Sequence, residues 1–203
     1  VTDHTDFGSA NVSGGTVTRT FTVENTGTGS LTLSGTPKVQ VSGTHAADFT
    51  VAVQPSSPVA ASGSTTFQVT FDPSATGLRT ATVTVLNDDT DEGSYDFAIQ
   101  GTGVSAPTIT TQPVAQTVVR GATANFTLAA TGTAPLTYRW RKGGVNLDDG
   151  GSVSGATTAI LTISNSQAAN GGNYDCVVAN AYGSVTSQVA VLTVERLPFS
   201  QWQ

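Results

Sequence analysis

The sequence predicts an all-β protein that consists of two antiparallel β-sandwiches in tandem. The chain of 203 residues contains 22 glycines and 8 prolines and is only 11% charged. Thr, Ser and Val are abundant, and this composition is typical of strands joined by tight turns. Short stretches of alternating apolar and polar residues recur, and no stretch has the 3.6-residue apolar period of a packed helix. The length suits one large or two small domains, and the strand patterns fall into two sets.

The first set of strand patterns spans residues 1–103. Each pattern places its apolar side chains on one face of a strand, and turns rich in Gly, Pro and Asn separate the patterns. Roughly seven strands at this spacing indicate an antiparallel sandwich. The residues expected on the inner faces are, in chain order, Phe21 and Val23; Leu31 and Leu33; Phe49, Val51 and Val53; Phe67, Val69 and Phe71; Ala81, Val83 and Val85; and Tyr95, Phe97 and Ile99.

The second set of strand patterns spans residues 108–195, after an expected linker at residues 104–107 that is too short to let the domains move far apart. Residues 196–203 include apolar side chains but have no strand rhythm, and we expect this tail to lead into a further region of a longer protein. The predicted strands of the second set contain Ile109 and the stretches Phe126–Ala130, Leu136–Trp140, Ile160–Ile163, Tyr174–Val178 and Val185–Val194.

Cys176 is the only cysteine of the chain and indicates the type of the second sandwich. A tyrosine two residues before a cysteine, with a tryptophan on an earlier strand, is typical of immunoglobulin-like sandwiches, in which the tryptophan packs against an inter-sheet disulfide. Here Trp140 and Tyr174 are present, but Leu128 stands at the position of the partner cysteine.

The stabilisation lost with the missing disulfide can be compared with the stabilisation that Leu128 contributes in its place. A disulfide across about 49 residues would contribute roughly 4 kcal/mol, and burying a leucine contributes about 1.5–3 kcal/mol. We therefore expect Leu128, Trp140 and Cys176 to form a compact apolar cluster. The alternative is a reactive thiol, which needs exposure and a lowered pKa, whereas strand alternation points Cys176 inward.

Several motifs in residues 5–103 occur together in a known family. The motifs are Asp6-Phe-Gly8, Phe21-Thr-Val-Glu-Asn25-Thr-Gly27, Ala47-Asp-Phe49, Phe67-Gln-Val-Thr-Phe-Asp-Pro73, Gly77-Leu-Arg-Thr-Ala81 and Tyr95-Asp-Phe-Ala-Ile99-Gln-Gly-Thr-Gly103. Together they resemble the choice-of-anchor D domain, which is related to the ASPM/SPD-2/hydin modules. The resemblance implies an immunoglobulin-like sandwich without catalytic residues, of a kind that occurs, often in tandem, in large bacterial surface and secreted proteins.

Residues 108–195 resemble bacterial immunoglobulin-like modules of the I-set kind. The resemblance rests on Pro135-Leu-Thr-Tyr-Arg-Trp140-Arg-Lys142, Leu161-Thr-Ile163, Asn170-Gly-Gly-Asn-Tyr174-Asp-Cys176, Ala179-Asn-Ala-Tyr-Gly183 and Val191-Leu-Thr-Val194. It implies that Tyr174 forms a tyrosine corner, with its hydroxyl bonded to backbone upstream. The whole chain is thus predicted to be two tandem immunoglobulin-like antiparallel β-sandwiches.

Composition excludes some classes of partner. The net charge is −6 with only 8 Lys and Arg, whereas nucleic acids and anionic membrane surfaces require clustered cations. No apolar run approaches the ~20 residues of a membrane span, so we expect neither nucleic-acid binding nor membrane insertion. A single thiol is compatible with a cytosolic protein or with a secreted bacterial protein, and the lysine-poor surface favours a secreted or cell-surface location.

The stretch Asn87–Gly93 is the candidate metal site. Asp88, Asp89, Asp91 and Glu92 repel one another unless solvent or a cation neutralises them, and oxygen-rich clusters suit Ca²⁺. The stretch is not an EF-hand, since its sixth position is Glu92 rather than Gly. The alternative interpretation is a polar hairpin tip that discourages edge-to-edge pairing. We expect no other cofactor.

No motif of the sequence points to catalysis. The chain has no G-x-S-x-G elbow, and His4 and His45 have no nucleophile motif nearby. We therefore expect a non-catalytic spacer or adhesion-type module of a larger bacterial extracellular protein, in contact with neighbouring domains and with an unidentified protein or glycan ligand. The alternative is a carbohydrate-binding accessory module of a secreted polysaccharide-active enzyme, for which only Tyr182, Trp202 and Tyr138 are candidate exposed aromatics.

Overall fold

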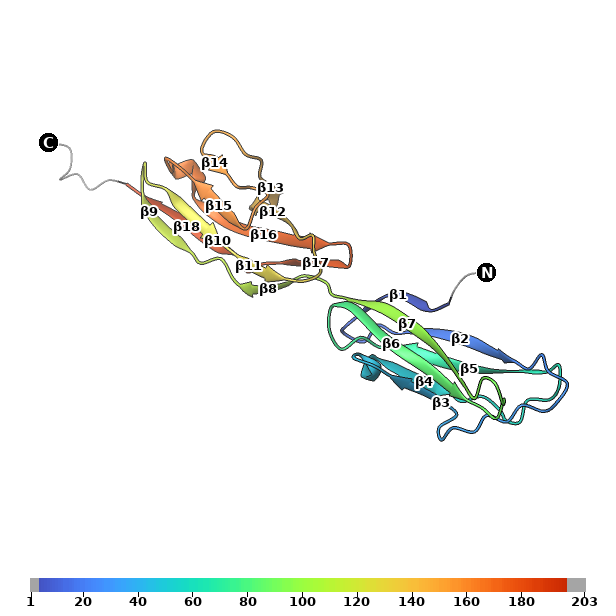
Figure 1. Cartoon of the computed structure of the whole chain (residues 1–203). Helices are drawn as coiled ribbons and strands as arrows, with labels where there is room; N and C mark the ends of the chain where they lie inside the picture. Colours follow the sequence, from blue (N-terminus) through green and yellow to red (C-terminus); the bar gives the residue numbers. More distant parts are fainter. Residues whose placement is uncertain (1–3, 197–203) are drawn as a thin grey trace. The chain divides into compact units, whose positions relative to one another are not determined.

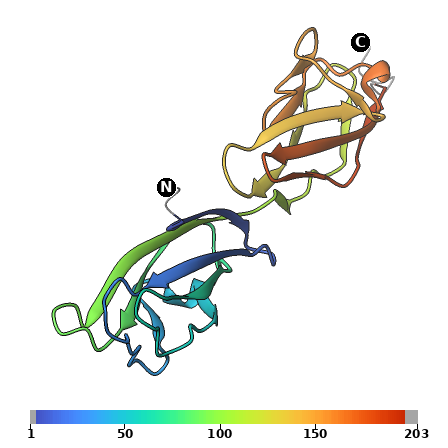
Figure 2. The same ribbon diagram turned by 90° about the vertical axis from the view of Figure 1, so that its right-hand side faces the viewer.

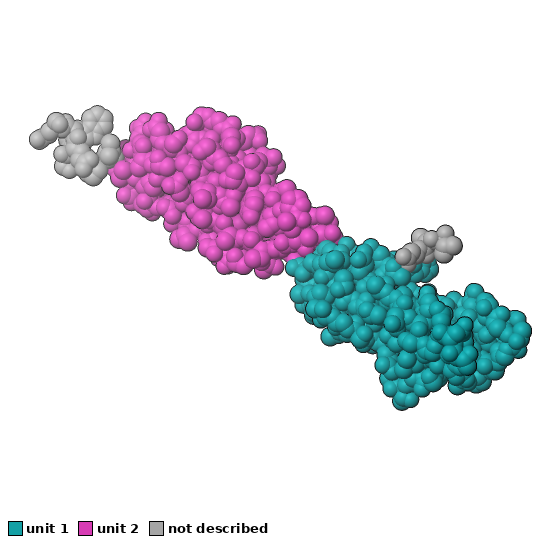
Figure 3. All heavy atoms as spheres, viewed as in Figure 1, with its two compact units in different colours: residues 1–104 teal, residues 105–203 magenta. Residues whose placement is uncertain are grey.

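The computed structural model describes residues 4–196, and the chain divides into two compact units between Val104 and Ser105 (Figure 3). Both units are antiparallel β-sandwiches, so the predicted fold class is confirmed (Figure 1). The described residues contain two helical elements, the short 3-10 turns η1 (Ala46–Asp48) and η2 (Ala168–Asn170). The tail residues 197–203, with Phe199 and Trp202, lie outside the described part.

Unit 1 consists of a four-stranded sheet facing a three-stranded sheet. The first has the order β1-β7-β6-β3, and the second has the order β2-β5-β4. All pairs are antiparallel except β1 with β7, which run parallel. The strands are β1 (Asp6–Asn11), β2 (Val17–Glu24), β3 (Val39–Ser42), β4 (Phe49–Val53), β5 (Ser64–Phe71), β6 (Gly77–Leu86) and β7 (Ser94–Val104).

The core of unit 1 is formed largely by phenylalanines on the inner faces of the strands. Phe7 packs edge-on against Phe49, at a centroid distance of 5.5 Å, and Phe49 stacks on Phe71 at 4.9 Å. Val69 and Val83 are fully buried between the sheets. The period-two alternation therefore predicted most of this core correctly.

Two inner-face predictions in unit 1 are wrong. Val53 is 48% exposed, because a β-bulge between Val51 and Val53 shifts the register against β5 and turns the side chain outward. Tyr95 is 56% exposed, although it lies on the same face of β7 as Phe97 and Ile99. Tyr95 lies on the part of β7 that does not pair with β1, and it lines a groove.

Unit 2 has the same kind of architecture with shorter strands. Its largest sheet has the order β13-β12-β16-β18-β9, with β17 also paired to β16, and β10, β15 and β14 form a facing sheet beside the pair β11–β8. The strands are β8 (Thr108–Thr111), β9 (Gln116–Val119), β10 (Ala124–Thr127), β11 (Ala129–Thr131), β12 (Thr137–Lys142), β13 (Val145–Asn146), β14 (Val153–Ser154), β15 (Ile160–Ile163), β16 (Gly172–Asn180), β17 (Gly183–Thr186) and β18 (Ala190–Glu195).

The core of unit 2 contains the predicted cluster in place of a disulfide. Leu128 (2% exposed), Trp140 (0%) and Cys176 (0%) are buried in one cluster, and Trp140 and Cys176 are opposite each other on β12 and β16. The Trp140 indole N–H donates to the Thr158 carbonyl at 2.8 Å. The Tyr174 hydroxyl donates to the Asn170 carbonyl at 2.6 Å, as expected for a tyrosine corner.

The residues expected to link the two sandwiches are hydrogen-bonded within the units. Val104 ends β7, is 3% exposed, and its carbonyl accepts from the Val12 amide at 2.9 Å. The Ser105 carbonyl accepts from the Asn180 side-chain amide at 2.8 Å, and the Ser105 amide donates to the Thr133 hydroxyl at 2.8 Å. Val104 is thus fixed in unit 1 and Ser105 in unit 2.

Candidate functional site

A groove of about 1040 Å³ opens in unit 1 beside the N-terminal half of β7. It lies between β7 and the C-terminal half of β2, and the loop after β2 and the β6–β7 loop close its end. Its floor is apolar, and Phe21 contacts Phe67 at a centroid distance of 5.2 Å and Phe97 at 5.3 Å. Phe21 and Phe97 are only half-buried, so this floor can contact a ligand.

Among the described residues, β1 covers only part of β7, and the groove lies beside the part that it does not cover. β1 pairs with β7 from Gln100 to Val104, and Phe7 of β1 fills the space between the sheets there. Residues Ser94–Ile99 of β7 pair with β6 on one side and with no described strand on the other (Figure 2). The groove therefore occupies the position that a longer β1 would fill.

The rim of the groove is polar and acidic. Glu24, Asp89 and Glu92 line it, and none of them forms an ion pair within residues 4–196. Asn25 has a structural role, because its side-chain amide donates to the carbonyls of Gly29 (2.8 Å) and Val59 (3.0 Å) and fixes the loop after β2. The site thus combines an apolar floor with uncompensated negative charge at one end.

The four acidic residues predicted to bind calcium are not gathered around one point. The Asp88 carboxylate accepts from the Thr32 amide at 2.7 Å, and this hydrogen bond lowers the pKa of Asp88. Asp89 and Glu92 line the groove instead. Within the described residues, no group of three or more His, Cys, Asp or Glu side chains is arranged to hold a metal ion. The calcium site stays a prediction.

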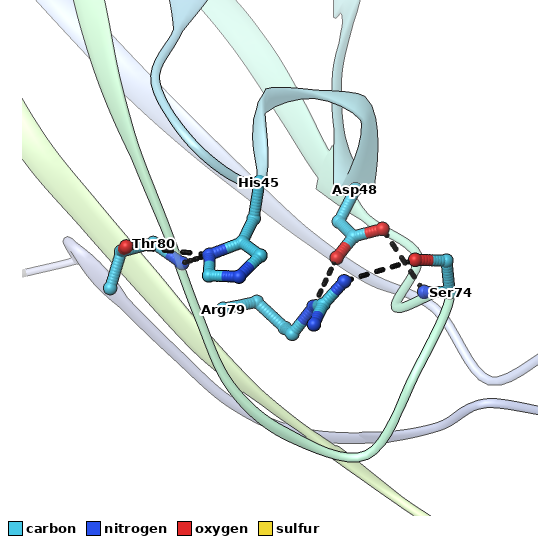
Figure 4. A network of polar contacts seen from close by, with 5 residues as sticks. All are labelled: His45, Asp48, Ser74, Arg79 and Thr80. Carbon is cyan, nitrogen blue, oxygen red and sulfur yellow. Dashed lines mark hydrogen bonds and ion pairs between the residues drawn. The ribbon is translucent and has the colours of Figure 1, made fainter.

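Unit 1 contains a buried ion pair that the sequence alone does not predict. Asp48 is 2% exposed and pairs with Arg79, whose guanidinium also donates to the Ser74 hydroxyl at 3.1 Å (Figure 4). The Ser74 amide donates to Asp48 at 3.1 Å. Burial alone would raise the pKa of Asp48, but the hydrogen bonds from Arg79 and Ser74 outweigh it and lower the pKa. Nearby, His45 accepts a hydrogen bond from the Thr80 amide at 3.0 Å.

This ion pair has a structural role. It joins the turn before β4 to β6 and to the Ser74 loop, and neither Asp48 nor Arg79 lines the groove beside β7. Asp48 and Arg79 both belong to motifs on which the family resemblance rests. Their joint occurrence is the one feature of the sequence that could have pointed to the ion pair. The two residues lie far apart in the sequence, so their contact cannot be predicted without knowing how the strands pair.

The remaining candidates lie in unit 2. Cys176 is fully buried, and burial raises the pKa of its thiol to about 11, so the inert interpretation holds. Tyr182 is 41% exposed and Tyr138 is half-buried, while Trp202 lies outside the described residues. The most exposed tyrosine of the described chain is Tyr95, at 56%, although strand alternation predicts it on an inner face. In residues 4–196, no helix has the length and apolar character needed to cross a membrane.

These features define a class of protein, a tandem pair of immunoglobulin-like β-sandwich domains. The chain belongs to the HYDIN/CFA65/VesB-like, Ig-like domain family, whose model matches residues 1–102. Residues 107–194 match the model of the immunoglobulin I-set domain. The predicted resemblance to a hydin-like domain followed by an I-set domain is therefore confirmed.

The chain is also similar to parts of larger proteins. It is 44% identical over 93 residues to Endoglucanase C of Cellulomonas fimi, a match that covers 45% of this chain and 8% of that protein. It is 34% identical over 106 residues to the mouse Leucine-rich repeats and immunoglobulin-like domains protein 3, covering 45% of this chain and 9% of that protein. The chain thus spans less than a tenth of the length of either relative.

Solved structures share the fold. The titin I-band fragment I67-I69 aligns over 94% of this chain and 62% of its own length, with a TM-score of 0.56 and 16% identity. The insect immune protein hemolin aligns over 63% of this chain and 32% of its own length, with a TM-score of 0.51 and 21% identity. At these identities, the similarity shows the immunoglobulin-like fold alone.

Proposed function

We propose that this chain is a non-catalytic structural and interaction module, of spacer or adhesion type, in a larger bacterial extracellular or cell-surface protein. The observation that carries the proposal is the tandem itself. Each sandwich has its own apolar core, and the main chain passes from Val104 to Ser105 with both residues hydrogen-bonded into their own unit. A connection without a long flexible segment suits a spacer.

The family assignment supports this proposal. Immunoglobulin-like sandwiches present loops and edges on a rigid framework, and both halves of the chain match such domains. A net charge of −6 favours solubility and disfavours nucleic acid as a partner.

The test is a replacement in the parent protein. Residues 1–195 are exchanged for a Gly/Ser segment of equal length and, as a control, for an unrelated pair of immunoglobulin-like domains. The Gly/Ser version should reduce surface display or adhesion, because it is flexible and presents no folded surface. The domain-pair control should retain display. Equal performance of the Gly/Ser version would contradict a spacer role.

A second candidate function is carbohydrate binding, favoured by the similarity to an endoglucanase. Tyr95 offers an exposed aromatic face beside a groove lined by Asn87, Asp89 and Glu92, and such side chains can stack on and hydrogen-bond to sugars. Pull-down with insoluble cellulose and a glycan array tests this candidate. Carbohydrate binding would be established if Tyr95→Ala abolishes the binding and Tyr182→Ala leaves it intact. The chain would then be more than a spacer.

A further inference from the structure

We propose that the groove of unit 1 binds an extended polypeptide segment, which adds as a strand to the free edge of β7 and carries a basic residue at its N-terminal end. This inference rests on the proposed interaction function and names its ligand and its site. It depends on three features of unit 1: the free backbone groups of β7, the apolar floor beside them, and the acidic end of the groove.

Between Ser94 and Ala98, β7 pairs with β6 on one side and with no strand of residues 4–196 on the other. The Gln100 amide donates to the Thr5 carbonyl at 2.9 Å, away from β6, whereas the Asn87 amide donates to the Gly93 carbonyl across the β6–β7 hairpin. Hydrogen-bonding direction alternates along an antiparallel strand. The amides and carbonyls of Ser94, Asp96 and Ala98 therefore point away from β6, on the side where no described strand pairs with these residues. Such an edge is a template for another strand.

The floor of the groove favours a strand with alternating apolar side chains. β1 shows what this space accepts, because it runs parallel to β7 and inserts Phe7, which is 1% exposed, between the sheets next to Phe21 and Phe71. Farther along β7, the half-buried Phe21 and Phe97 line the groove. A strand in line with β1 would place an aromatic or branched side chain there at every second residue.

The acidic residues of the rim favour a basic residue at one end of the ligand. Glu24, Asp89 and Glu92 lie at the end of the groove where β7 begins. A strand parallel to β7 has its N-terminal end at this position, so a lysine or arginine there meets three carboxylates that have no ion-pair partner within the described chain. The same charge disfavours an acidic segment.

The experiment titrates the intact chain with the peptide acetyl-Lys-Thr-Phe-Thr-Val-Thr-Gly-amide and follows backbone amides by NMR. Two matched peptides serve as controls, one with Glu in place of Lys and one with the same residues and the lysine moved to the C-terminal end. The expected result is saturable shifts at the amides of Ser94, Asp96 and Ala98, with the first peptide binding about threefold or more tightly than either control.

Two variants separate the edge from the charge. Ala98→Pro removes one outward N–H and leaves the ladder to β6 intact, as proline at a sheet edge permits, and should weaken binding by about fivefold or more. Glu92→Lys should weaken binding by about threefold, whereas Glu195→Lys, the same charge change on an exposed residue of unit 2, should not. If Ala98→Pro does not fold, N-methylation of alternate peptide amides removes the same hydrogen bonds from the ligand side.

The proposal is overturned by no binding at about 1 mM peptide, by shifts that lie outside β7 and the groove, or by shifts at β7 with cellohexaose and none with the peptide. The replacement experiment in the parent protein tests the proposed spacer function independently of peptide binding by the groove. If the Gly/Ser version loses display while the peptide does not bind, the spacer role stands and the groove assignment falls.

Discussion

At the scale of single residues, burial decides what Cys176 does. The thiol is fully buried opposite Trp140 in the core of unit 2, and desolvation raises its pKa to about 11. A thiol with a pKa this high carries little thiolate near neutral pH and reacts slowly even when reached. Strand alternation was sufficient to predict this, because β16 alternates regularly and the tyrosine corner fixes its phase.

We predict that Cys176 reacts with a disulfide reagent only after denaturation. In native buffer at neutral pH, labelling should be slower than in urea by orders of magnitude, since access requires unfolding. Mass spectrometry of the labelled chain measures this, with the denatured protein as the control. Rapid labelling of the folded chain would contradict the assigned burial.

The Asp48–Arg79 pair gives a residue-level prediction with a defined pH dependence. Asp48→Asn removes a buried charge-assisted contact and should lower the free energy of unfolding by about 2 kcal/mol near neutral pH. Because the folded-state pKa of Asp48 lies below its ordinary value of 3.8, this stabilisation is present above 3.8 and is lost as the pH falls through the folded-state pKa.

Urea denaturation at about pH 7 and about pH 2.5 measures the difference. The gap between wild type and Asp48→Asn should be wide at the higher pH and narrow at the lower pH. Asp72→Asn is the matched control, since Asp72 is exposed and its substitution should change stability by less than about 0.5 kcal/mol. A gap that is equal at both pH values would show that Asp48 acts through shape and not through charge.

At the scale of elements, the sequence was informative where alternation is regular and misleading where pairing is non-local. The inner faces of β5 and β6 could be predicted, because each repeats with period two. Val53 could not, because a bulge depends on the register between β4 and β5. The exposure of Tyr95 could not be predicted either, because it depends on how far β1 extends along β7.

The β6–β7 loop carries the calcium prediction. Asp88 is already hydrogen-bonded to Thr32, while Asp89 and Glu92 line the groove. If a calcium ion gathers the four acidic residues, the melting temperature should rise with added Ca²⁺ and fall when EDTA is added. Mg²⁺ at the same concentration is the control for general screening. An unchanged melting temperature with EDTA would reject the site.

At the scale of the whole molecule, both sandwiches are stabilised by packing without a cross-link. Unit 1 uses clustered phenylalanines, and unit 2 uses Leu128 with Trp140 at the position of the usual disulfide. The two-domain organisation could be predicted from strand patterns and motifs, and the family models match the same two halves. The groove of unit 1 could not be predicted, because its parts come from β2, β7 and two loops that the fold brings together.

Amide hydrogen exchange along β7 in the free protein tests the central claim, that this strand has an open edge ready to pair. We predict an alternating pattern. The amides of Asp96 and Ala98, which point away from β6, should exchange rapidly, whereas those of Phe97 and Ile99, which bond to β6, should be protected. Binding of the basic peptide should then protect Asp96 and Ala98. Uniform protection from Tyr95 to Ile99 in the free chain would show that this edge is already covered and would contradict the account.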